Sequence, residues 1–156
     1  MALKPDREYN EVTDITNFWS TGQTTAEKGG VASQSGSSTG VGLDDSGITV
    51  AYLVDPSGAI AKGVLLQTVN PAMSTTRDFI NYENGEIRAG TKCTLVKKGF
   101  VVTDMITGTA PTAGAAAYLA ASGLISATQA TSAPQVGRFE TAQDANGFAR
   151  VSIDIT

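Results

Sequence analysis

Short segments in which apolar residues alternate with polar ones, or run together, fill the chain from residue 48 to its end. Residues 148–155 show the clearest period of two, with Ala149, Val151, Ile153 and Ile155 on one side and Phe148 with three polar residues on the other. Such a period predicts a strand with one buried face. The same reasoning predicts strands at residues 48–54, 59–69, 91–96, 100–106, 115–120, 124–128, 135–140 and 148–155.

Glycine-containing turns separate these segments, at spacings close to the about 8–12 residues that all-β sandwiches and barrels show. Residues 91–96 and 100–106 flank a Lys-Lys-Gly sequence and are predicted to form a hairpin. Residues 113–121 are rich in alanine, but Pro111 and two glycines leave room for only about two helical turns, so a strand is predicted there too. The sequence therefore predicts an all-β fold: a small β-barrel or jelly-roll-like domain at residues 48–156.

The first 47 residues have a different pattern. They are mostly polar, and they end in a Gly/Ser/Thr-rich run over residues 29–47. We predict that residues 1–47 form an extended N-terminal arm without a core of its own, which takes its form from a neighbouring surface. If the arm is extended, Phe18 and Trp19 point in opposite directions. Trp19 then either caps the barrel or anchors a partner or sister subunit, and the sequence leaves both interpretations open.

Composition narrows the choice of partners. The formal net charge is −4, and the basic residues are scattered apart from Lys97 and Lys98, so we expect no nucleic-acid partner. No apolar run reaches the length of a membrane span, so we expect a soluble protein with no membrane partner. The single cysteine, Cys93, excludes an internal disulfide and is predicted to be a buried, inert thiol within a strand.

The chain contains no histidine. This removes the Ser-His-Asp triad, the Cys-His dyad and the commonest metal ligand, and we therefore expect no enzyme activity, no cofactor and no metal. Three acidic turns, at residues 44–47, 55–58 and 144–147, do not match the ligand spacing of a calcium loop. Their Asp and Asn side chains are predicted to bind their own backbone instead.

An ordered series of short sequences gives the chain a family resemblance. Two of the longest are Gly90-Thr-Lys-Cys-Thr-Leu-Val-Lys-Lys-Gly-Phe-Val-Val-Thr103 and Asp144-Ala-Asn-Gly-Phe-Ala-Arg-Val-Ser-Ile153. With the segments at 57–58, 62–66, 69–70, 77–82, 108–114, 117–123 and 136–139, they resemble the capsid cement, or decoration, proteins of tailed bacteriophages, especially the structural proteins of cyanophages. The resemblance covers about residues 48–156.

The resemblance implies a small β-domain that binds the outside of a phage head at junctions between capsomers, without enzymatic activity. It also implies synthesis in the host cytoplasm, a final location on the outer surface of the virion, and two partners: the major capsid protein and further copies of the chain, as a homodimer or homotrimer. The residues predicted to make these contacts are Lys4, Arg7, Tyr9, Phe18, Trp19, Arg77, Phe79 and Tyr82.

Two other functions remain open from the residues alone. One is an adhesin or carbohydrate-binding β-module on a virion or cell surface, which would gather aromatic residues on one face. The other is a hydrolase whose site is a carboxylate pair, which would need a deep pocket with two carboxylates close together.

Overall fold

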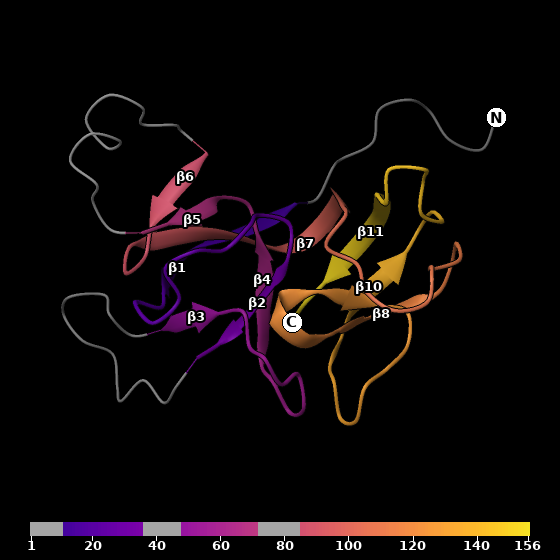
Figure 1. The fold of residues 1–156 in the computed structure, drawn as a ribbon, viewed down its shortest axis with the longest axis horizontal. Helices are drawn as coiled ribbons and strands as arrows, with labels where there is room; N and C mark the ends of the chain where they lie inside the picture. The colour runs from indigo at the N-terminus through magenta and orange to yellow at the C-terminus, as the bar shows by residue number, and fades with distance from the viewer. Residues whose placement is uncertain (1–10, 36–47, 72–84) are drawn as a thin grey trace.

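The computed structural model describes residues 11–35, 48–71 and 85–156. The fold is all-β, as the sequence predicts, and its described strands are joined by loops and one short 3-10 turn (Figure 1). The elements are β1 (Val12–Trp19), β2 (Val31–Gln34), β3 (Thr49–Ala51), β4 (Ala61–Leu65), β5 (Thr68–Asn70), β6 (Glu86–Arg88), β7 (Lys92–Thr103), β8 (Ala116–Leu119), η1 (Ala121–Gly123), β9 (Ile125–Ser126), β10 (Gln135–Phe139) and β11 (Ala149–Asp154).

A closed five-stranded barrel forms one half of the molecule. Its strands follow one another in the order β1, β3, β2, β4 and β7, and β1 pairs with β7 to close the ring. The β1–β3 contact is parallel and the other four are antiparallel. In the closed ring each strand has a neighbour on both sides. This stabilises short strands that would be marginal in an open sheet.

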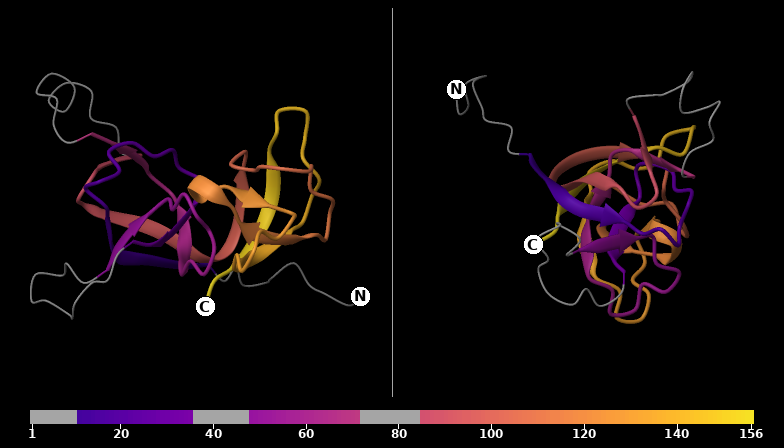
Figure 2. Two further views of the ribbon diagram at one scale, coloured as in Figure 1. Left: turned by 60° about the horizontal axis from the view of Figure 1, so that its bottom comes forward. Right: turned by 90° about the vertical axis from the view of Figure 1, so that its left-hand side faces the viewer.

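The second half is an open sheet built on the far end of β7, in the order β7, β11, β10, β8 and β9. Figure 2 shows the two halves side by side, with the early strands in one and the orange to yellow strands in the other. The predicted hairpin at Lys97-Lys98-Gly99 is wrong, because β7 is one continuous strand of 12 residues. Gly99, at φ 142°, lies where the pairing of β7 passes from β1 to β11, so it serves as a bend rather than a turn.

Adjacent residues of the shared strands face two different cores. In β4, Leu65 belongs to the cluster inside the barrel with Trp19, whereas Val64 belongs to the cluster beneath the second sheet with Phe139 and Val151. Both sides of the barrel wall are therefore covered here, which explains why the adjacent residues Val64 and Leu65 are both apolar and both buried.

The predicted boundary at residue 47 differs from the structure for residues 11–35. Both β1 and β2 lie in the predicted arm, yet they are strands of the barrel. Their signal was weak because the first half of β1 is exposed on both faces, with Ile15 63% exposed, and because β2 places small residues, Ala32 and Ser33, in the core. The remainder of the predicted arm, residues 1–10 and 36–47, lies outside the described residues.

Candidate functional site

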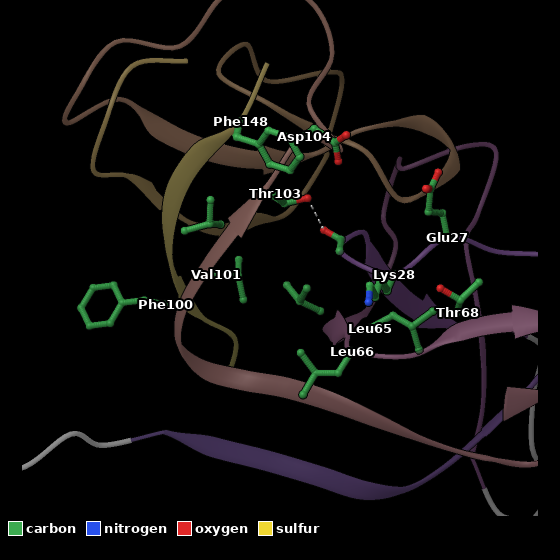
Figure 3. A pocket seen from close by; sticks show the side chains of 13 residues that line it. Glu27, Lys28, Leu65, Leu66, Thr68, Phe100, Val101, Thr103, Asp104 and Phe148 are labelled. Atoms are coloured by element: carbon green, nitrogen blue, oxygen red, sulfur yellow. Dashed lines mark hydrogen bonds between the residues drawn. The ribbon is translucent and has the colours of Figure 1, made fainter. Parts of the chain in front are cut away.

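A cleft of about 460 Å³ lies where the barrel meets the second sheet. The curved end of β7 forms one wall with Val101 and Thr103, and the end of β4 with the residue after it forms the other, with Leu65 and Leu66 (Figure 3). A hydrogen bond ties the walls together, since the Thr103 hydroxyl donates to the carbonyl oxygen of Gly29 at 3.0 Å. The bend of β7 therefore creates the cleft and places residues from distant parts of the chain around it.

Large apolar side chains around this cleft remain exposed. Phe100 is 50% exposed, Val102 67%, Phe148 39% and Leu66 40%; all four belong to the residues that border the same cleft, and the Phe100 ring points outward from it (Figure 3). Single exposed apolar residues are common on any protein, but a group of them around one hollow is typical of a surface that binds a partner. We name these four residues the apolar rim.

The position of Phe100 is reinforced by a charged neighbour. The Arg150 guanidinium lies 4.4 Å from the centre of the Phe100 ring, and its Nε lies 3.2 Å from a carboxylate oxygen of Glu140. A cation above an aromatic ring is attracted by the ring's negative face. This group orients Phe100 on the outer face of the sheet, where the cross-strand register also places Val102 opposite Arg150.

The turn at residues 144–147 sets the position of Phe148, the residue just before β11. The Asp144 carboxylate accepts hydrogen bonds from the main-chain N–H groups of Asn146 and Phe148, both at 2.9 Å. The backbone-binding role predicted for the turn at 144–147 is confirmed, and Asp55 does the same for Ser57 at 2.9 Å. The turn at 44–47 lies outside the described residues. Asp144 thus holds the start of β11 so that Phe148 reaches the cleft.

Charged side chains complete the lining. Glu27, Lys28 and Asp104 are exposed residues of the cleft, and in Figure 3 they lie around its apolar centre. Carboxylates in such open positions interact with water and with the charged groups of a partner. The arrangement suits contact with another macromolecule, because an apolar centre with a charged border is the usual composition of a protein interface.

Two of the predicted contact residues, Phe18 and Trp19, belong to the described part of the chain, and neither lines this cleft. Trp19 is buried, at 1% exposure, which favours the barrel-cap interpretation and leaves it inaccessible to a partner. Phe18 is half-buried, and the Lys92 ammonium lies 5.7 Å from its ring centre. The other six predicted contacts, Lys4, Arg7, Tyr9, Arg77, Phe79 and Tyr82, lie outside the described residues.

The described residues can be compared with the metal and thiol chemistry considered from the sequence. They contain no group of three or more His, Cys, Asp or Glu side chains placed to hold a metal ion. Cys93 is buried as predicted, and burial raises the pKa of its thiol to about 11. The part of the chain that the structure describes also holds no helix with the length and hydrophobicity of a membrane span.

The Cys93 thiol makes stability depend on pH in the alkaline range. Its pKa is about 11 in the folded protein against 9.0 for an ordinary cysteine, so the unfolded chain loses the proton first. The stabilisation by the neutral thiol is complete below pH 9 and is lost as the pH rises through 11. The free energy of unfolding should fall by about 2–3 kcal/mol as a result. Urea titrations from pH 8 to 11 should show this loss, and Cys93→Ala should flatten it. An equally steep loss in the variant would contradict the assignment.

No protein-family model matches the chain, and a comparison with curated proteins found no match.

Proposed function

We propose that this protein is a capsid cement, or decoration, protein, which binds the outside of a phage head at capsomer junctions and stabilises the mature shell without catalysis. Its proposed partners are the major capsid protein and further copies of the same chain. The observation that carries the proposal is the apolar rim, because four exposed apolar residues around one cleft suit protein contact. The ordered sequence resemblance supplies the identity of the partner.

The proposed mechanism is stabilisation by binding. A protein that binds only the mature lattice stabilises that lattice by mass action at every occupied site. A subunit that touches two or three shell subunits gains further, because all its contacts must break together before it leaves. A rigid barrel is well suited to this task, since little ordering is needed when it binds.

Co-sedimentation with phage heads tests this proposal. We expect the purified protein to sediment with expanded heads that lack their decoration protein, and not with unexpanded procapsids. Val102→Glu places a charge in the apolar rim and should weaken binding more than tenfold, about 1.4 kcal/mol or more. Val102 is 67% exposed, so the substitution should leave the melting temperature unchanged.

Val54→Glu is the matched control, because Val54 is 80% exposed and does not line the cleft. This variant should bind heads as the unmodified protein does. If the unmodified protein fails to sediment with expanded heads, the proposed function is wrong. If it sediments and Val102→Glu binds equally well, the attachment surface lies elsewhere on the molecule.

A further inference from the structure

A β-bulge in β1 turns Ile15 outward. The register of β1 with β7 shifts between Asp14 and Asn17, so Ile15 and Thr16 share one position along β7. The Asp14 carboxylate holds this bulge, because one of its oxygens accepts hydrogen bonds from the Thr16 N–H at 2.9 Å and from the Thr16 hydroxyl at 2.6 Å. Ile15 is 63% exposed. Bulges commonly re-aim a side chain next to functional sites, and this one presents an apolar side chain to solvent.

The surface along β1 carries a local excess of positive charge. Three lysines of β7 lie in the stretch that pairs with β1, namely Lys92, Lys97 and Lys98. Residues 11–19 contribute two carboxylates, those of Glu11 and Asp14, and the Asp14 carboxylate already accepts the two hydrogen bonds from Thr16. Because the net charge of the chain is −4, its copies repel one another on average, so a basic region favours contact with an acidic one.

The cleft between the barrel and the second sheet has complementary properties. Leucine and valine side chains form much of its lining, and its border carries the carboxylates of Glu27 and Asp104 beside the ammonium of Lys28 (Figure 3). An apolar side chain flanked by lysines therefore suits the cleft in polarity and in charge. In Figure 3, β1 runs on the side of β7 away from the cleft, so a chain cannot place Ile15 in its own cleft.

We propose that Ile15 of one copy of the chain inserts into the cleft of a second copy, with the lysines of β7 facing the carboxylates at the cleft border. This contact is heterologous, because it joins two different surfaces. Each pair of copies leaves one cleft and one Ile15 unoccupied until a ring closes, so a closed ring is the expected assembly. The inference deepens the proposed function and rests on it for the role of the apolar rim in protein contact: it names a second copy as the occupant of the cleft.

Sedimentation velocity of the full chain over a range of concentrations tests this contact. We expect the unmodified protein to self-associate, and Ile15→Glu and Leu66→Glu each to weaken the association by about tenfold or more. Each substitution puts a carboxylate into an apolar contact beside the acidic cleft border. Val54→Glu is the matched control, because Val54 is 80% exposed and belongs neither to the cleft nor to β1, and it should associate as the unmodified protein does. If Leu66→Glu lowers the melting temperature, Val102→Glu, at a cleft residue that is 67% exposed, takes its place.

Mixing the two variants shows whether the contact joins two different surfaces. Ile15→Glu keeps an intact cleft and Leu66→Glu keeps an intact Ile15, so an equal mixture should form dimers at concentrations where each variant alone stays monomeric. A symmetric contact cannot be restored in this way. The proposal is overturned if the unmodified protein stays monomeric, if Ile15→Glu associates as the unmodified protein does, or if the mixture forms no dimers. Co-sedimentation with expanded heads is a separate measurement: a protein that binds heads but fails these tests keeps the proposed function and loses this inference.

Discussion

A chain that begins at Ile48 should not fold cooperatively. It would lack β1 and β2, two of the five strands that close the barrel. It would also lack Trp19, Ala26 and Ala32 from the inner cluster, so β3 and β4 would expose their buried faces. Because cooperative unfolding needs a complete core, thermal denaturation followed by near-ultraviolet circular dichroism should show no sharp transition. We expect the unmodified chain to show one.

A chain that begins at Asn10 is the control, since it keeps every described strand. Its melting temperature should lie within a few degrees of that of the full chain, because both the barrel and the second sheet keep all their described strands. A sharp transition in the chain that begins at Ile48 would show that β7 and the second sheet form a stable unit without the barrel. That result would restore the boundary at residue 47.

The parts of the fold that the sequence predicts best are those with one buried and one exposed face. In β11, the odd-numbered residues are buried and the even-numbered ones are not, as their period of two predicts. β1 is harder to detect, because its outward side chains include Val12 and Ile15 while the buried Asn17 is polar. Its strand character comes from pairing with β3 and β7, which no local pattern can reveal.

The bend of β7 illustrates a second limit. A glycine after two lysines fits a turn, and local sequence cannot tell a turn from a bend in a long strand. The outcome depends on the partners: β1 and β4 pair with the first half of β7, and β11 pairs with the second half. Continuous partners keep the strand extended through Gly99.

The candidate site was only partly visible in the sequence. The period of two in residues 148–155 does place Phe148 and Arg150 together on the outer face, and the turn at 144–147 marks where that strand begins. Sequence reasoning did not select Phe100, Val102 or Leu66, because each lies within an ordinary apolar segment. Their exposure results from the junction between the two halves, which is a property of the whole fold.

Trp19 packs into the core inside the barrel. Its ring meets that of Tyr52 edge to face, with centres 5.1 Å apart and planes at 89°. The indole N–H donates to the carbonyl oxygen of Gln23 at 2.9 Å, and the Gln23 side chain in turn accepts the N–H of Tyr52 at 2.9 Å. Burial of the tryptophan therefore leaves its polar atom satisfied and links β1 to the segment after β3.

Trp19→Ala should lower the free energy of unfolding by about 3–5 kcal/mol, because it removes a large side chain that is 1% exposed and leaves a cavity among Tyr52, Leu65 and Leu95. The melting temperature should fall by about 10 °C or more. Phe18→Ala is the control: Phe18 is the adjacent aromatic residue but only half-buried, so its loss should cost far less. Urea denaturation measures both variants, and co-sedimentation with expanded heads separates stability from binding. If Trp19→Ala keeps its melting temperature but no longer binds expanded heads, Trp19 is an interface anchor. That result would contradict its role as the barrel cap.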